Sequence, residues 1–249
     1  MCRDSMAITM NMPDIYLSPP HACEYLEGEL ASILFLSPEQ NLSMSHYSQL
    51  VSLGFRRSGH LVYRPKCQHC QACIPVRIPV HQFHPSRQQK RCWKRNQDLE
   101  IIARPAEYQE EHYHLYLRYL RARHADGSMV DSSPDDYQDF LTCHWCETLF
   151  YEFRLGPRLM AVAVTDLLEE GLSAVYTFFD PDEGERSLGT FAILSQIEAA
   201  KRLNAQHLYL GYWIGKCGKM AYKSRFEPLE IFKGGSWQVL EANSDSGSQ

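Results

Sequence analysis

No long hydrophobic run is present in the sequence. A membrane-spanning helix needs about 20 consecutive apolar residues, whereas the apolar run at residues 159–164 has six. The start of the chain (MCRDSMAITMNMPD) lacks a basic segment followed by an apolar one, so we expect no signal peptide. Nine cysteines without a secretion signal favour reduced thiols in the cytosol. These absences exclude a membrane protein, a secreted disulfide scaffold and a collagen-like chain, and predict a cytoplasmic protein without a membrane partner.

Acidic residues are absent from residues 40–97, a stretch of 58 residues that holds ten Lys and Arg. Charge is segregated along the chain. Residues 1–105 carry 12 basic and 8 acidic side chains (net +4), and residues 106–249 carry 13 and 22 (net −9). A solvated basic face is one explanation of such a stretch. The complete exclusion of carboxylates favours the other explanation, which is a polyanionic partner.

The hydrophobic patterning predicts an α+β chain with a core, since 44% of the residues are hydrophobic. Helices are expected at 43–53, 105–124, 133–145, 187–203 and, as a short basic segment, 219–225. Strands are expected at 60–64, 75–80, 149–155, 158–168, 172–179, 206–213 and 237–240. An antiparallel meander followed by a helix and another strand is the order found in GNAT-like acyltransferase folds. We therefore expect a smaller cysteine-containing, basic N-terminal domain (1–105), a GNAT-like transferase domain (106–242) and a disordered tail (243–249).

Three cysteines in KCQHCQAC stand at C-x2-C-x2-C spacing: Cys67, Cys70 and Cys73. Thiols at this spacing can point at one centre, as in zinc and iron–sulfur sites. A closed site needs a fourth ligand, for which Cys23 is the first candidate, followed by His69 and Cys92. The alternative is that the cysteines are unliganded and close a tight turn.

The segment RQQKRCWKR interleaves five cations with Trp93. The cations are Arg87, Lys90, Arg91, Lys94 and Arg95. Cations neutralise phosphates and an aromatic ring can stack on an unpaired base, so this segment is expected to bind nucleic acid. The alternative is a surface segment with Trp93 buried. A second block, LYLGYWIGKCGKMAYKSRFEP, places further cations beside aromatic residues, and Lys219 and Lys223 are its candidates for nucleic-acid contact.

The run SAVYTFFDPDEGERSLGT places an aromatic strand and an Asp-Pro turn before a helix, where acetyltransferases bind the pyrophosphate of coenzyme A. Their R/Q-x-x-G-x-G/A pattern is met at Arg186 and Gly189. Phe191 occupies the last small position, which disfavours coenzyme A. Two other classes stay open: a coenzyme A-dependent N-acetyltransferase, and a non-catalytic RNA-binding protein with a metal knuckle.

Several long motifs together resemble one family. GFRRSGHLVYRPKCQHCQACIPVRIPV, WKRN, SAVYTFFDPD, SLGT and LYLGYWIGKCGKMAYKSRFEPLE are similar to the bacterial aspartate/glutamate leucyltransferases, relatives of the eukaryotic arginyl-tRNA–protein transferases. The resemblance covers about residues 23–240. It implies a GNAT-like core that transfers leucine from leucyl-tRNA to the α-amino group of proteins beginning with Asp or Glu, which marks them for degradation in the N-degron pathway. The eukaryotic relatives have a C-x-x-C motif near the start of the chain. The matching stretch here is Cys23-Glu24-Tyr25-Leu26, which lacks one of the two thiols.

The chemistry implied by this resemblance fits the residues present. Converting an ester to an amide is downhill, so the transfer requires no cofactor, and neither a membrane nor DNA is expected as a partner. The nucleophile is an α-amine with a pKa of ~7.7. Asp180 is expected to orient or deprotonate it, and the candidate oxyanion donors are Tyr176, Tyr209 and Tyr212. Arg56 and Arg57 are expected to hold the acceptor's carboxylate, with phosphate contact as the alternative.

Overall fold

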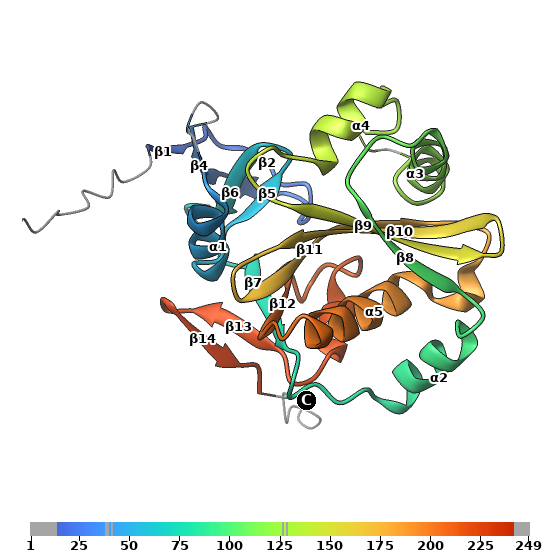
Figure 1. Ribbon diagram of the computed structural model, residues 1–249. Helices are drawn as coiled ribbons and strands as arrows, with labels where there is room; N and C mark the ends of the chain where they lie inside the picture. Colours follow the sequence, from blue (N-terminus) through green and yellow to red (C-terminus); the bar gives the residue numbers. More distant parts are fainter. Residues whose placement is uncertain (1–13, 38–39, 41, 126, 128, 242–249) are drawn as a thin grey trace, which may run out of the picture.

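The computed structural model describes residues 14–37, 40, 42–125, 127 and 129–241 (Figure 1). The predicted tail at 243–249 lies outside the described residues. The described chain forms an α+β fold, which confirms the predicted class at this level. None of its helices is long and apolar enough to cross a membrane.

One large sheet of eight strands forms the centre of the fold, in the order β14-β13-β7-β12-β11-β10-β9-β8. Its strands are β7 (Ile74–Pro79), β8 (Glu100–Pro105), β9 (Thr148–Leu155), β10 (Arg158–Leu167), β11 (Gly171–Phe179), β12 (His207–Trp213), β13 (Glu230–Lys233) and β14 (Ser236–Val239). Neighbouring strands are antiparallel except for β11 and β12. The predicted boundary at residue 105 therefore does not separate two sheets, because β7 and β8 are hydrogen-bonded into the same sheet as β9–β12.

The parallel pair of β11 and β12 is short. Their register covers only residues 171–173 against 207–209, although β11 continues to Phe179 and β12 to Trp213. β7 is hydrogen-bonded along the other side of β12, through Trp213. The two strands thus pair over three residues each, and β12 continues beside β7 rather than beside β11.

A smaller four-stranded sheet lies beside one end of the large sheet (Figure 1). It is formed by β1 (Ile15–Leu17), β4 (Ile33–Leu36), β6 (Leu61–Pro65) and β5 (Arg56–Ser58), while β2 (His21–Ala22) pairs with β3 (Leu30–Ala31). Helix α1 (Met44–Ser52) begins at Ser43, whose hydroxyl accepts from the backbone N–H of His46. The predicted helix at 43–53 and strand at 60–64 agree with α1 and β6.

Helices cover both faces of the large sheet (Figure 1). They are α2 (Arg87–Arg95), α3 (Glu110–Arg123), α4 (Pro134–Leu141) and α5 (Leu188–Arg202), with the short 3₁₀ helices η1 (Gly184–Arg186) and η2 (Ala221–Arg225). Side chains of β10 alternate between the two faces: Met160 and Ala163 belong to the core under α5, whereas Val162 and Val164 belong to the core under α3 and α4.

Candidate active site

Arg56 and Arg57 are neighbours in β5 but have different environments. The Arg57 side chain has no exposed area and forms a two-point ion pair with Asp166 of β10, at 2.7 Å from Nε and 2.6 Å from Nη2. Asp166 also accepts from the Tyr47 hydroxyl (2.9 Å) and from Thr148 (2.7 Å). The expectation that Arg57 holds a substrate carboxylate is therefore wrong: its guanidinium is buried and already holds one from the chain itself.

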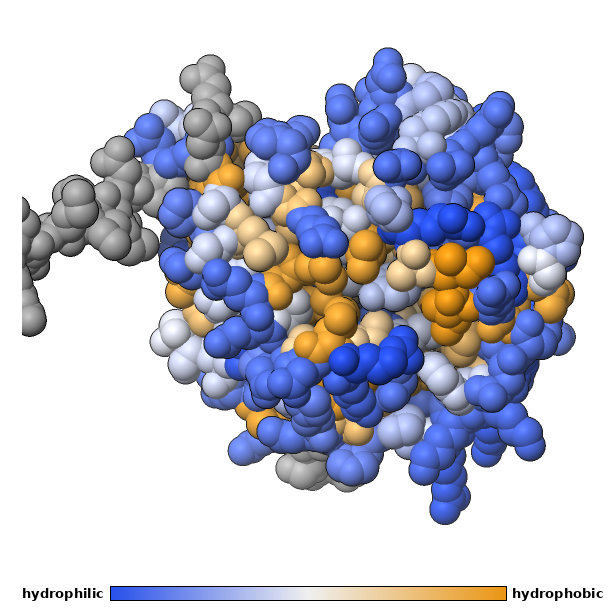
Figure 2. Space-filling view, in the orientation of Figure 1, coloured by the Kyte–Doolittle hydropathy of each residue, from blue (hydrophilic) through white to orange (hydrophobic). Residues whose placement is uncertain are grey.

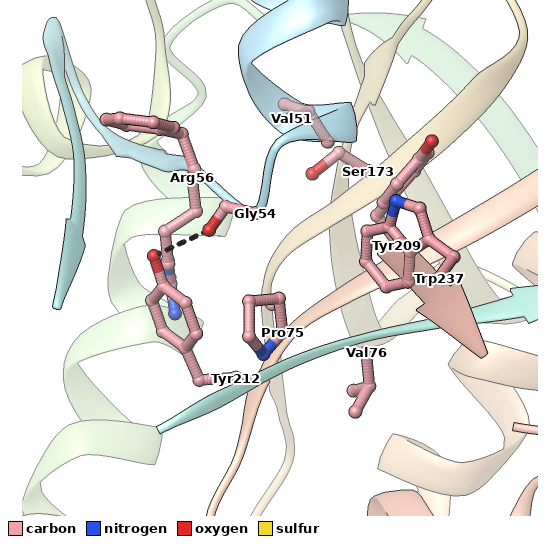
Figure 3. Close-up of a pocket in the computed structure, with 11 residues that line it drawn as sticks. Val51, Gly54, Arg56, Pro75, Val76, Ser173, Tyr209, Tyr212 and Trp237 are labelled. Atoms are coloured by element: carbon pink, nitrogen blue, oxygen red, sulfur yellow. Dashed lines mark hydrogen bonds between the residues drawn. The ribbon is translucent and has the colours of Figure 1, made fainter. Parts of the chain in front are cut away.

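Arg56 lies on the other side of β5 and lines a pocket between α1, β7 and β12 (Figure 3). Its guanidinium is 5.9 Å from the ring centres of both Tyr63 and Tyr212. Gly211 makes room for it: a Cβ there would lie 3.3 Å from Nη1 of Arg56, and Gly211 has a φ of +71°. Arg56 is half-buried and forms no ion pair within the described chain. Arg56 is thus a cation without a carboxylate partner among the described residues, at the edge of a narrow cavity.

The three candidate tyrosines differ in the state of their hydroxyl groups. The Tyr212 hydroxyl lies 3.1 Å from the backbone carbonyl of Gly54 (Figure 3) and 3.1 Å from that of Tyr63, so its single proton is shared between these two acceptors. The Tyr209 hydroxyl accepts from Arg77 at 3.2 Å. Tyr212 therefore does not fit the predicted role of oxyanion donor, because its proton is already used. Tyr176 is half-buried on β11, and its hydroxyl has no hydrogen-bond partner within the described part of the chain, so it keeps a donor free.

Lys223 of η2 was expected to contact tRNA, but its side chain is buried. Its Nζ donates to the backbone carbonyl of Tyr212 at 2.6 Å. Burial lowers the pKa of Lys223 to about 7, and the charge of Arg56 acts in the same direction. The predicted tRNA contact is therefore wrong for Lys223. Lys219, four residues earlier, is exposed and remains available for it.

Asp180 follows β11, where the aromatic strand ends. Its buried carboxylate accepts from Arg118 of α3 (2.8 Å) and Arg158 of β10 (2.6 Å). Burial raises the pKa of Asp180, but the hydrogen bonds from Arg158 and the backbone N–H of Asp182, with the two nearby charges, outweigh it and hold the pKa below its usual value. A carboxylate in this state is a weak base. This environment argues against the expected role in deprotonating the amine.

The cysteines expected to bind metal gather without forming a site. Burial and the nearby thiols of Cys67, Cys23 and Cys70 raise the pKa of Cys73 to about 12, so the four lie in one region. The eight cysteines of the described chain are all free thiols. Within that part of the chain no three His, Cys, Asp or Glu side chains are arranged to hold a metal ion. The donor set as folded does not fit zinc or a cluster.

The basic segment forms helix α2. A capping box between Ser86 and Gln89 stabilises the start of this helix. All five cations of this helix are exposed: Arg87, Lys90, Arg91, Lys94 and Arg95. Hydrophilic side chains cover this corner of the molecule (Figure 2). Trp93 instead packs against Phe191 of α5, with ring centres 5.3 Å apart. It is partly buried at the edge of the hydrophobic core. Trp93 is therefore a packing residue, and the expectation that it stacks on a base is not supported.

A direct contact joins α2 to the second basic block. The side-chain amide of Gln89 donates to the backbone carbonyl of Arg225 at 3.0 Å. Lys216, Lys219 and Arg225 are exposed along this block, which also contains Tyr212 of the Arg56 pocket. The exposed cations of α2 and of residues 216–225 thus lie on adjoining segments. We call them together the basic surface.

Comparison with known proteins places the chain in a family. Models of the arginine-tRNA-protein transferase N terminus and C terminus match residues 21–91 and 111–233. Relatives named aspartate/glutamate leucyltransferase occur in Nitrosococcus oceani (54% identical over 92% of this chain and 96% of the relative), Alcanivorax borkumensis (51%, 93% and 96%) and Pseudomonas fluorescens (52%, 90% and 96%). A solved domain of a lysylphosphatidylglycerol synthetase from Agrobacterium fabrum is 12% identical with a TM-score of 0.44, covering 67% of this chain and 51% of that one, which is too distant to define the fold.

The matched models and the names of the relatives define its class, which is an aminoacyl-tRNA–protein transferase. The chain belongs to the arginine-tRNA-protein transferase family, in which the relatives that it matches over most of their length are aspartate/glutamate leucyltransferases. The resemblance based on the sequence motifs is thereby confirmed.

Proposed function

We propose that this enzyme transfers leucine from leucyl-tRNA to the α-amino group of proteins that begin with Asp or Glu. The observation that carries the proposal is Arg56, a half-buried cation without an ion-pair partner in the described chain, set in a pocket between two tyrosine rings. A guanidinium can grip a carboxylate by two parallel hydrogen bonds, which favours an acidic acceptor residue over a neutral one. The names of the relatives give the same specificity.

The transfer needs little more than positioning. Attack of the acceptor's α-amine on the leucyl ester forms an amide and releases the 3′-hydroxyl of the tRNA, a downhill exchange that consumes neither ATP nor a redox cofactor. With a pKa of ~7.7, a substantial fraction of the amine is neutral at cytosolic pH. The free hydroxyl of Tyr176 is our candidate donor to the oxyanion.

The basic surface is the proposed tRNA contact. Its exposed cations on α2 can neutralise phosphates, and its second block leads towards Tyr212 and the Arg56 pocket. A tRNA held there would have its aminoacylated end directed at the acceptor. This reaction belongs in the cytoplasm, where it would mark acceptors for degradation in the N-degron pathway.

A GNAT-like arrangement is part of the proposal. The β9–β11 meander, the helix α5 and the parallel strand β12 follow the expected order, and β11 and β12 separate after a short pairing. This arrangement is poorly suited to coenzyme A as the carrier of the acyl group. Phe191 is buried in the core, and Arg186 is engaged by Asp98 at 2.9 Å and by Glu183 at 3.4 Å.

The test is direct transfer. Purified protein is incubated with leucyl-tRNA carrying labelled leucine and with peptides beginning with Glu, Asp, Lys or Ala. Label on the Glu and Asp peptides alone supports the proposal. Label on all four or on none contradicts it, and stabilisation by acetyl-CoA against heat would revive the acetyltransferase alternative.

A further inference from the structure

Lys223 is a buried lysine with only neutral hydrogen-bond partners. Its side chain ends at the backbone carbonyl of Tyr212 (2.6 Å) and near Sδ of Met220 (3.9 Å). Lysines are almost never buried unless a carboxylate pairs with them, because an unpaired ammonium loses its hydration. No carboxylate of the described chain forms an ion pair with Lys223. The buried amine lacks the countercharge that ordinarily accompanies it.

Arg56 lacks a countercharge as well, and Tyr212 connects the two cations. The ring of Tyr212 flanks the guanidinium of Arg56, its carbonyl accepts from Lys223, and its hydroxyl is fixed by the carbonyl of Gly54. The carbonyl and the hydroxyl of Tyr212 are thus both held by hydrogen bonds, and its ring lies beside Arg56. Displacing the carbonyl at Lys223 would shift the ring against which Arg56 is placed.

The charged and titratable groups that act on Lys223 come from three elements. Arg56 on β5 disfavours its protonated form, and the Cys217 thiol, from the segment before η2, favours it. Tyr212 on β12 contributes its carbonyl. Burial is the largest effect and lowers the pKa of Lys223 to about 7, so the free enzyme holds this amine partly neutral at neutral pH.

We infer that Lys223 is the second cation of the acceptor site. It is a positioning residue, and the acidic side chain that docks on Arg56 stabilises its protonated form. The inference rests on the proposed function. A carboxylate at Arg56 cancels the repulsion that Arg56 exerts on Lys223, so Lys223 takes up a proton from solvent as the acceptor docks. The protonated amine then holds the Tyr212 carbonyl more firmly, which fixes Arg56 around the bound carboxylate.

The sign of the pH dependence follows from this coupling. The acidic side chain binds more tightly to the enzyme with protonated Lys223, so its affinity is highest below pH 7. Affinity falls as the pH rises from about 7 towards the higher pKa of Lys223 in the complex, and then levels off. A glutamine side chain carries no charge and produces neither effect.

Proton uptake on binding is the measurement that separates this role from simple packing. An N-acetylated peptide beginning with Glu, which has no titrating α-amine, is titrated calorimetrically at pH 7 in two buffers that differ in ionisation enthalpy. We expect fractional proton uptake with the wild-type enzyme and with Lys233→Met, a matched control at an exposed lysine on β13. Lys223→Met should abolish the uptake, and the matching Gln peptide should bind at least tenfold more weakly.

Transfer kinetics supply the second readout. With leucyl-tRNA saturating, Lys223→Met should raise the KM of a Glu-initiated peptide by on the order of tenfold and leave the KM of leucyl-tRNA unchanged. Proton uptake that persists in Lys223→Met overturns the inference. So do equal KM values for the Glu-initiated peptide in Lys223→Met and the wild type. Absence of uptake in the wild-type enzyme also overturns it, even if that enzyme transfers leucine. If the wild-type enzyme transfers no leucine to Glu peptides, the proposed function itself fails.

Discussion

The carboxylate of Asp166 and the guanidinium of Arg57 form a buried two-point ion pair that joins β10 of the large sheet to β5 of the small one. Arg57 also donates to the backbone carbonyl of Leu141 at 2.9 Å. Because successive side chains of a strand alternate in direction, fixing Arg57 on the inner side of β5 also fixes Arg56 towards the pocket. The buried pair therefore positions the residue that we assign to the acceptor.

Breaking this pair should destabilise the protein strongly. Asp166→Asn leaves the Arg57 charge buried and uncompensated, which costs about 3–5 kcal/mol in comparable pairs. Urea unfolding measures the loss, with Asp139→Asn at an exposed position as the control. A loss below about 1 kcal/mol would show that the pair contributes little to joining the two sheets.

Removing the Arg56 guanidinium should affect the acceptor and spare the donor. Arg56→Ala loses charge-assisted hydrogen bonds worth about 1.5–3 kcal/mol, which corresponds to a rise of about 10- to 150-fold in the KM of a Glu-initiated peptide. Leucyl-tRNA affinity should be unchanged. If the variant instead loses affinity for tRNA and keeps its KM for the peptide, Arg56 contacts phosphate.

The basic surface should determine the salt dependence of tRNA binding. The acidic net charge of the whole chain gives little general attraction to RNA, so binding depends on local cations. Arg91→Gln with Lys94→Gln should flatten the slope of log affinity against log salt by about 2, or by about 1.4 for single-stranded phosphates. The affinity for the acceptor peptide should stay constant. A slope equal to that of the wild type would assign α2 to a solvated face and move the tRNA contact to residues 216–225.

Asp180→Asn tests whether this carboxylate is a base or a structural anchor. Because folding lowers its pKa, Asp180 stabilises the fold fully above its unfolded value near 3.8, and the contribution is lost as the pH falls through the lower folded value. The variant should therefore melt at a lower temperature than the wild type at pH 7, and the gap should narrow below about pH 4. The pH profile of turnover should keep its shape. A turnover loss that shrinks above the pKa of the amine would restore Asp180 as the base.

The elements with clear local signals could be predicted from the sequence. β9, β10 and β11 are apolar runs broken at Gly156-Pro157 and at residues 169–171, and the N-cap Ser133 with Pro134 begins α4 as expected. β8 has exposed residues over most of its length, so it shows no alternation, and it was missed. β13 was also missed, since it is only four residues long.

The site was less predictable because its contacts join distant parts of the chain. Alternation implies that Arg56 and Arg57 face opposite sides of a strand, but the partner that decides which one is buried, Asp166, lies 109 residues away. The burial of Lys223 likewise depends on β12, and its sequence neighbours suggest an exposed basic helix. The space that Gly211 leaves for Arg56 also depends on a contact between β12 and β5, which the local sequence does not indicate.

Transfer of labelled leucine from leucyl-tRNA to a matched pair of peptides that begin with Glu or Gln, by wild-type enzyme and by Arg56→Ala, tests whether Arg56 selects the acidic acceptor. The wild type should label the Glu peptide strongly and the Gln peptide weakly. Arg56→Ala should lose most of this preference by labelling the Glu peptide less. Equal labelling of both peptides by the wild type, or an unchanged preference in Arg56→Ala, would contradict the assignment of Arg56 to the acceptor.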